Sequence, residues 1–305
     1  MRDSGSRDSS SNLLRAIGLF SPVPMLAGNP APGSPDSRPH PRIGAGVKST
    51  DLPGFLSLAG LCAEGVVGHL QVLLYPESGA EARARLEAMA AAGVAVILHA
   101  PHHLHGVNLS AGTFGTASAR QVEDAMARTF EAADLLRACA IVLHAGEYAP
   151  GRREEAVAAF SEFLDRYRDP RFLLENLPPH RGHMQMLGCT APELQEIASG
   201  RVAGFCLDFA HLHCTASASA QPFRGLLAGF GTLPVRLHHL SGTPAGSTVD
   251  RHLPLDHPEN GLDLPAVMGW IRAHPGIPTS LELHGAGSSE YRTQAAVFAR
   301  LVASL

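Results

Sequence analysis

The sequence predicts an α/β protein folded as a single (β/α)8 TIM barrel. Short apolar runs typical of buried parallel strands alternate with segments that have helical spacing, and the alternation repeats eight times over about 260 residues. That number of repeats and that length are what a (β/α)8 barrel requires. The predicted strands are residues 43–48, 66–75, 94–99, 140–144, 171–175, 202–208, 235–239 and 278–282.

The segments between these runs carry helix signals. Residues 81–92 are rich in Ala, Arg and Glu and end at Gly93, a typical C-terminal cap. Residues 118–138 and 154–167 place apolar side chains on one face. Thr190-Ala-Pro-Glu193 is a capping box that opens another helix.

The last two helices are expected to start at Asp263 and at Ser288 or Ser289. A doubly wound open sheet is the alternative fold, but Gly44-x-Gly46 after the first strand lacks the third glycine of a phosphate-binding fingerprint.

The composition favours a cytoplasmic monomer. The chain has 305 residues, 45% hydrophobic content and a net charge of -4, so no overall basic field indicates a nucleic-acid partner. Its five cysteines are odd in number and form no CxxC pair, which favours reduced thiols. No apolar run approaches the roughly 20 residues of a membrane span. Residues 1–41 are rich in Ser and Pro and are expected to be a disordered extension to a barrel domain over 42–305.

Six consecutive predicted strands end in residues that can bind a metal. Parallel strands of a barrel deliver their last residues to one rim, where active sites lie. Each residue alone has a structural explanation, such as Asp208 capping the next turn. Together, acids and imidazoles directed at a common centre would repel and desolvate one another without a cation. The six are His99, His144, Glu175, Asp208, His239 and Glu282.

Three further candidates follow the strands. His211 comes three residues after Asp208, and Asp250 and His252 lie in the loop after residues 235–239. The Asp-x-His spacing puts both side chains on one face of an extended segment. His211 has the alternative of being a partly buried loop histidine, and His238 competes with His239 for its place.

These pieces together resemble the endonuclease IV branch (AP endonuclease family 2) of the xylose isomerase-like barrels. The resemblance rests on an ordered set of short motifs between residues 97 and 282, and barrel periodicity extends it to about 43–305. The motifs are Ile97-Leu98-His99 with Asn108-Leu109, Val142-Leu143-His144-Ala145-Gly146, Leu174-Glu175-Asn176, Cys206-Leu207-Asp208-Phe-Ala-His211, His239-Leu240, Asp250-Arg251-His252 and Leu281-Glu282.

The resemblance implies a phosphodiesterase with up to three Zn²⁺ ions that cuts DNA 5′ to abasic sites. One ion would be held by His99, His144 and Glu175, and a third by His211, Asp250 and His252. The second would be held by Glu175 as a bridge, with Asp208, His239 and Glu282. The resemblance assigns the catalytic roles to Glu175 and Glu282. Imidazole and carboxylate ligands leave zinc open positions for water and substrate.

Two departures bear on the substrate. Ser241-Gly242 replaces the family's usual Asn-Asp, and the loop after His99 lacks the tyrosine that family members push into the base stack, where His103 and Leu104 are the candidate substitutes. The alternative function is a sugar isomerase or epimerase, acting on a small sugar or sugar phosphate with one Mn²⁺ or Mg²⁺ held by Glu175, Asp208, His239 and Glu282. A non-catalytic barrel would require these positions to be lost.

Overall fold

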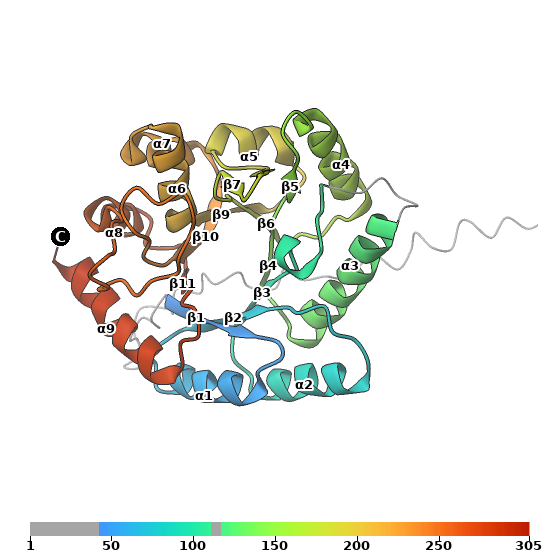
Figure 1. The fold of residues 1–305 in the computed structure, drawn as a ribbon. Helices are drawn as coiled ribbons and strands as arrows, with labels where there is room; N and C mark the ends of the chain where they lie inside the picture. Colours follow the sequence, from blue (N-terminus) through green and yellow to red (C-terminus); the bar gives the residue numbers. More distant parts are fainter. Residues whose placement is uncertain (1–42, 111–116, 305) are drawn as a thin grey trace, which may run out of the picture. The chain divides into compact units, whose positions relative to one another are not determined.

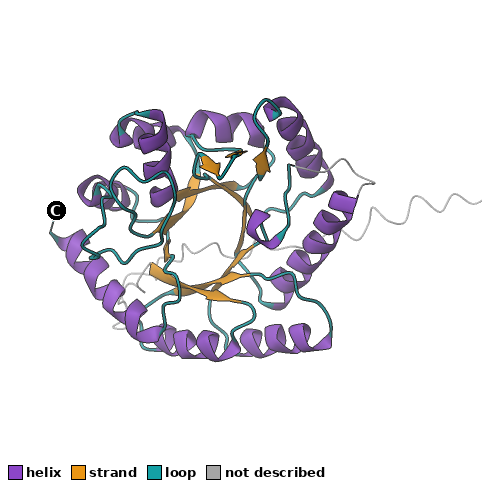
Figure 2. Cartoon of the chain, in the orientation of Figure 1, coloured by secondary structure: helices purple, strands orange, loops and turns teal. Residues whose placement is uncertain are grey.

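The computed structural model describes residues 43–110 and 117–304. Eight parallel strands close into a barrel in the order β1-β11-β10-β9-β6-β4-β3-β2, and helices surround the ring (Figures 1 and 2). The barrel strands are β1 Ile43–Lys48, β2 His69–Leu73, β3 Val96–His99, β4 Ala140–Leu143, β6 Phe172–Glu175, β9 Gly204–Asp208, β10 Val235–Leu240 and β11 Thr279–Leu281. The predicted TIM barrel is therefore confirmed, and the closed ring rules out the doubly wound alternative. The predicted disordered segment, residues 1–41, lies outside the described residues.

The helices of the described residues form the outer layer of the barrel. Their apolar faces pack on the outward-facing side chains of the strands and form the main core, which contains Phe55, Phe160 and Tyr291. The helices are α1 Leu52–Ala63, α2 Ala80–Ala91, α3 Ala117–Leu135, α4 Arg153–Arg166, α5 Ala191–Ala198, α6 Phe209–Ser219, α7 Phe223–Gly229, α8 Leu264–Ala273 and α9 Ser288–Ala303, with the 3-10 helices η1 His103–His105 and η2 Phe230–Thr232. None of the helices in this part of the chain is long and apolar enough to span a bilayer.

A separate small sheet is formed by the segments that follow β4 and β6. It is antiparallel, in the order β5-β8-β7, and it was not predicted from the sequence. Its strands are only two or three residues long, too short to show the alternation that marks a strand. They are β5 Glu147–Tyr148, β7 His180–Arg181 and β8 Met184–Met186. The five cysteines, all within the described part, form no disulfide.

The inside of the barrel has an apolar floor on one side. Five neighbouring strands, β3, β4, β6, β9 and β10, each contribute one residue to a buried cluster that is distinct from the outer core: Ile97, Val142, Leu173, Cys206 and Leu237. The opposite wall is more polar, because β2 contributes His69 and Gln71 and β11 contributes Ser280, all buried. Gly44 on β1 leaves room for His69, since a Cβ there would lie 2.2 Å from the imidazole Nε2.

Candidate metal centre

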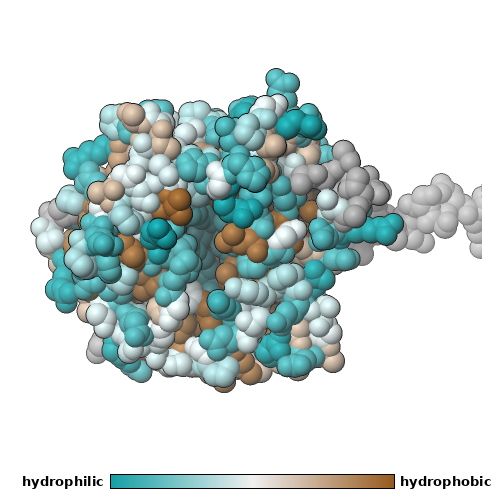
Figure 3. Space-filling model, viewed as in Figure 1, coloured by the Kyte–Doolittle hydropathy of each residue, from teal (hydrophilic) through white to brown (hydrophobic). Residues whose placement is uncertain are grey.

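The predicted site residues lie one pleat above this floor. Side chains of a strand alternate between its two faces, so the residue two positions after an inward-facing one also faces inward. The residues two positions after the five floor residues are His99, His144, Glu175, Asp208 and His239. The residue two positions after Ser280 is Glu282. The residues with ligand chemistry are thus inward-facing positions at the ends of six strands or directly after them, at the end of the barrel that Figure 3 shows hollowed near its centre.

Glu175 lies at the middle of the cluster and is 1% exposed. Its Oε2 is 3.2 Å from His99 Nε2 and 3.1 Å from His144 Nε2. Its Oε1 is 3.1 Å from His239 Nδ1 and 3.3 Å from His211 Nδ1. Oε2 thus faces the Nε2 atoms of His99 and His144 and Oε1 faces Nδ1 of His239, which is the arrangement of a carboxylate that can bridge two ions.

The remaining residues form a second group beside Glu175. Asp208 caps α6 by accepting the His211 backbone N–H on Oδ1 at 2.7 Å. Its other oxygen, Oδ2, stays within the cluster, 4.0 Å from His239 Nδ1. Asp208 therefore caps α6 with one carboxylate oxygen and belongs to the cluster through the other. Asp250 Oδ2 lies 3.5 Å from His211 Nε2 and 3.0 Å from His252 Nε2.

Four of the five site histidines are oriented by an oxygen atom outside the cluster. Such second-shell acceptors fix the tautomer and direct the other ring nitrogen towards a metal. His99 Nδ1 lies 3.0 Å from the Ala100 carbonyl, His211 Nδ1 2.8 Å from the Asn176 carbonyl, His239 Nε2 2.8 Å from Gln71 Oε1 and His252 Nδ1 3.2 Å from the Glu282 carbonyl. His144 is the exception: its outer nitrogen, Nδ1, is buried and makes no hydrogen bond.

The charges of the cluster balance one another in the metal-free protein. Burial raises the pKa of Asp208 to about 7. Burial opposes ionisation of Glu175 too, but the neighbouring His239 and His144 hold its pKa well below the ordinary range. Burial favours neutral His252, yet the Asp250 carboxylate, whose Oδ2 lies 3.0 Å from His252 Nε2, raises the His252 pKa to about 9. Burial lowers the pKa of His144 to about 3 despite the nearby Glu175, so this ring is neutral.

The donor atoms fit divalent cations. Asp208 Oδ2, Asp250 Oδ2 and His239 Nδ1 are buried and make no hydrogen bond, although His239 Nδ1 lies 3.1–4.0 Å from three carboxylates. A cation between such atoms would satisfy all of them and replace the protonated imidazoles as counter-charge. The nine predicted residues form three compact groups of ligand atoms among themselves: His99, His144 and Glu175; Glu175, Asp208, His239 and Glu282; and Asp208, His211 and Asp250.

The first two groups are the predicted ones, and the third differs in one member. The sequence predicts His211, Asp250 and His252, whereas the structure brings Asp208 into the compact group and leaves His252 in contact with Asp250 from outside it. His252 has a φ of 48°, an uncommon value for a residue other than glycine. The loop backbone therefore sets the direction of its ring, which residue spacing alone could not show.

The alternation of side chains along β10 shows which of His238 and His239 faces the cluster. His239 points into the cluster. His238 points out of the barrel, where its Nε2 accepts a hydrogen bond from Trp270 Nε1 at 3.2 Å and its ring packs on Phe209. It is therefore a buried structural histidine.

Two residues that orient the cluster were given no role in the sequence analysis. Gln71 on β2, 3% exposed, accepts from His239 and donates to Glu282 Oε1. Asn176 exchanges two hydrogen bonds with the Asp208 backbone, at 2.8 and 2.9 Å, and so ties the ends of β6 and β9 together. The sequence does contain one signal for Gln71: it is a polar residue two positions after His69 in a buried strand, so it faces the same side of the strand as His69.

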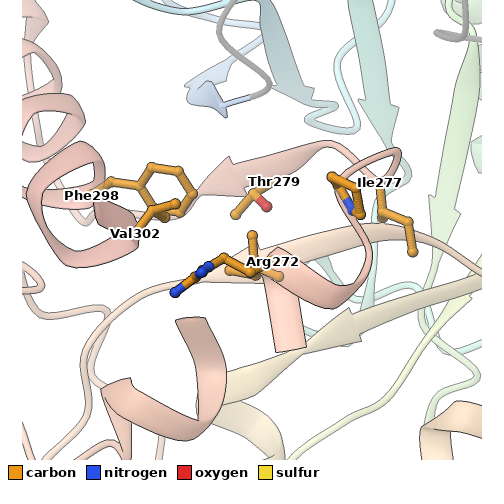
Figure 4. Close-up of a pocket in the computed structure, with 7 residues that line it drawn as sticks. Arg272, Ile277, Thr279, Phe298 and Val302 are labelled. Carbon is orange, nitrogen blue, oxygen red and sulfur yellow. The ribbon is translucent and has the colours of Figure 1, made fainter. Parts of the chain in front are cut away.

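A second, apolar pocket lies away from this cluster. Its lining includes Ile271, Ile277, Thr279, Phe298 and Val302, from α8, the turn that follows it, the start of β11, and α9 (Figure 4). Because Thr279 is the first residue of β11 and Glu282 follows its last, the pocket lies at the opposite end of that strand. It has no carboxylate or imidazole and does not compete as the catalytic centre.

Comparisons with known proteins agree with the expected resemblance. A family model described as the xylose isomerase-like TIM barrel matches residues 63–301. A protein named probable endonuclease 4, from Nitratidesulfovibrio vulgaris (strain DP4), is 33% identical over 194 residues, which cover 57% of this chain and 66% of that protein. In its homologue from the Hildenborough strain, the matched part covers 58% of the length. The chain thus spans less than two thirds of these relatives.

Solved structures show the same fold at low identity. Endonuclease IV from Thermus thermophilus matches 87% of this chain and 100% of its own with a TM-score of 0.63 at 19% identity. A D-psicose 3-epimerase solved in the presence of D-fructose matches 85% of this chain and 98% of its own with a TM-score of 0.58 at 15% identity. The family model shows that the chain belongs to the xylose isomerase-like TIM barrels, and the similarity to proteins named probable endonuclease 4 agrees with the resemblance expected from the sequence.

Proposed function

We propose that this protein is a metal-dependent phosphodiesterase of the endonuclease IV kind that cuts DNA 5′ to abasic sites. The observation that carries the proposal is the set of three ligand groups that share Glu175 and Asp208. A barrel that uses a single ion has no need for His99, His144, His211 and Asp250 at the same mouth. The similarity to proteins named probable endonuclease 4 supports the same choice.

The ligand types favour Zn²⁺. The nine residues supply five imidazoles, four carboxylates and no thiolate, and imidazole is a preferred ligand of zinc. Ions held here would stabilise charge on phosphoryl oxygens and supply a nucleophilic water at neutral pH. The protein's own part is to hold the donors: Glu175 presents one oxygen to each of two groups, and Gln71 fixes the orientation of His239 and Glu282.

Glu282 is the most exposed of the four carboxylates and is therefore the acidic ligand best placed to meet the substrate. Its side chain is 17% exposed, whereas those of Glu175 and Asp208 are 1% and 0% exposed. Leu104 lies within η1 beside the mouth and is 65% exposed. An apolar side chain in that position can act as a wedge between bases, as leucine does in other proteins that kink DNA. It takes the place of the absent tyrosine.

The test is cleavage of a duplex oligonucleotide with a single abasic site, with Zn²⁺ supplied to the protein. We expect a cut 5′ to the abasic site, none in the undamaged duplex, and none with Glu175→Gln. Cleavage that is as efficient on undamaged DNA would contradict the abasic specificity. No cleavage of any phosphodiester by zinc-loaded protein would contradict the proposed activity.

The second candidate is a sugar isomerase or epimerase. The observation that favours it is that Glu175, Asp208, His239 and Glu282 form a complete four-ligand group by themselves. Interconversion of ketoses or sugar phosphates by the protein loaded with Mn²⁺ or Mg²⁺, without DNA cleavage, would select this candidate.

A further inference from the structure

The turn that follows β3 carries three histidines at the edge of the metal centre. His102 is the N-cap of η1, and His103 and His105 belong to it. His102 is buried, and His103 and His105 are partly exposed. His105 has a structural role, because its Nδ1 accepts the His102 backbone N–H at 3.2 Å and its ring packs on Tyr75. The ring of His102 accepts only a long hydrogen bond, and Nδ1 of His103 makes none.

The rings of His102 and His103 lie against His144. The ring centroids of His102 and His144 are 4.6 Å apart, and those of His103 and His144 are 5.7 Å apart. One nitrogen from each of the three rings falls within 4.8 Å of the others, so the three can surround one ion. Of the three, His144 also faces a carboxylate, since its Nε2 lies 3.1 Å from Glu175 Oε2.

Unpartnered nitrogens point to a ligand here. His103 Nδ1 and His144 Nδ1 are both buried without a hydrogen bond, and the bond that His102 Nδ1 accepts from Leu104 N is long, at 3.4 Å. The other four site histidines have an oxygen acceptor on the outer nitrogen, whereas His144 lacks one and its ring lies against the rings of His102 and His103. Three nitrogen donors without carboxylate suit Zn²⁺, Co²⁺ or Ni²⁺ and suit Mg²⁺ or Ca²⁺ poorly.

We propose that His102, His103 and His144 form an additional transition-metal site that captures ions at the rim and passes them to the buried centre. A neutral imidazole carries one proton and can give only one nitrogen to a metal. His144 therefore serves either the outer site or the inner group with Glu175, whose Oε2 faces His144 Nε2 at 3.1 Å. An ion in the outer site is one ligand exchange away from the inner one.

The exposure of His103 compared with that of the buried centre supports the capture of ions at the rim. Glu175, Asp208 and His239 are at most 1% exposed, so an ion must lose its water before it reaches them. His103, which is partly exposed, can bind an ion while part of its hydration shell remains. The capture role depends on the proposed metal centre, whereas the existence of the outer site can be measured without any catalysis.

The binding test is made in a Glu175→Gln background, which weakens the two inner groups that share this carboxylate and leaves the group of Asp208, His211 and Asp250 as a constant contribution in all variants. Metal-free protein is titrated with Co²⁺, whose visible absorption reports its ligands. We expect Co²⁺ to bind, and His103→Gln added to Glu175→Gln to weaken that binding about tenfold or more. Adding His183→Gln, which changes an exposed loop histidine, should have no effect. Equal Co²⁺ affinity with and without His103 would overturn the site.

The capture test uses the otherwise unchanged protein. The double variant His102→Asn, His103→Gln removes both imidazoles, and asparagine keeps an acceptor for the N–H of Leu104 at the N-cap. After removal of metal, we expect this variant to take up Co²⁺ at least about tenfold more slowly than the unchanged protein and to reach the same final content. Unchanged uptake rates would overturn the capture role, and a failure of DNA cleavage would leave both results readable.

Discussion

A substitution of Gln71 tests whether hydrogen bonds from outside the metal centre hold its ligands in position. It is buried on β2, two residues after His69, and its amide bonds two residues of the same ligand group, His239 and Glu282. The substitution Gln71→Met keeps the length and volume of the side chain and removes both hydrogen bonds. His239 Nε2 then loses its hydrogen-bond partner.

The expected effects follow from these two bonds. A buried donor left without its acceptor costs about 1–3 kcal/mol of folding stability. Loss of a second-shell partner typically lowers metal affinity about 10–100-fold, which corresponds to about 1.4–2.7 kcal/mol. We expect Gln71→Met to show both effects: a lower free energy of unfolding in the metal-free protein, and weaker binding of one ion, measured by competition with a chromophoric chelator.

Gln294→Met is the matched control. Gln294 is also buried and also makes two hydrogen bonds, accepting from Leu255 N at 2.8 Å and donating to Asp256 Oδ1 at 2.7 Å, away from the centre. Its substitution should destabilise the fold by a similar amount and leave metal affinity unchanged. Equal metal affinity in Gln71→Met and Gln294→Met would refute the positioning role of Gln71.

Three further outcomes are expected. Glu175→Gln should abolish turnover and lower the zinc content, measured by mass spectrometry, at the two sites that share this carboxylate; wild-type activity would remove the bridging role. His238→Gln should cost about 1 kcal/mol through loss of the Trp270 hydrogen bond and leave zinc content unchanged, whereas loss of zinc would place His238 in the centre. Burial lowers the pKa of His69 to about 4, below the value of about 6.5 in the unfolded chain, so this residue contributes about 3 kcal/mol that is present above pH 6.5 and lost as the pH falls to 4. Chemical denaturation across that pH range should show that the free energy of unfolding falls less in His69→Gln than in the unchanged protein. An identical fall in both proteins would contradict this assignment.

Much of the fold could be predicted because periodicity is local. A four-residue buried strand such as Val96–His99 has a continuous apolar run, and the alternation of such runs with helices indicates a barrel. The candidate ligand positions were predicted from the same feature, since an acid or a histidine at the end of an apolar strand is conspicuous. The short strands of the β5-β8-β7 sheet have no such signal, because pairing between distant loops creates them.

The finer features of the site depend on orientation, which sequence does not encode locally. Asp208 serves both as the cap of α6 and as a member of the cluster, because its two oxygens face different partners. His238 and His239 are neighbours in sequence, and only the pleat of β10 separates their roles. The place of His252 depends on a positive φ in its loop. Gln71 lies far from the ligands in the sequence and reaches them only through closure of the barrel.

The central claim is that nine side chains at the barrel mouth gather around divalent cations. The most direct measurement is the anomalous scattering of a zinc-loaded crystal at the zinc absorption edge. We expect three peaks among the carboxylates and imidazoles, with the two oxygens of Glu175 contacting two different ions. A crystal with no peak among these residues, or with a single peak that Glu175 does not touch, would contradict the account.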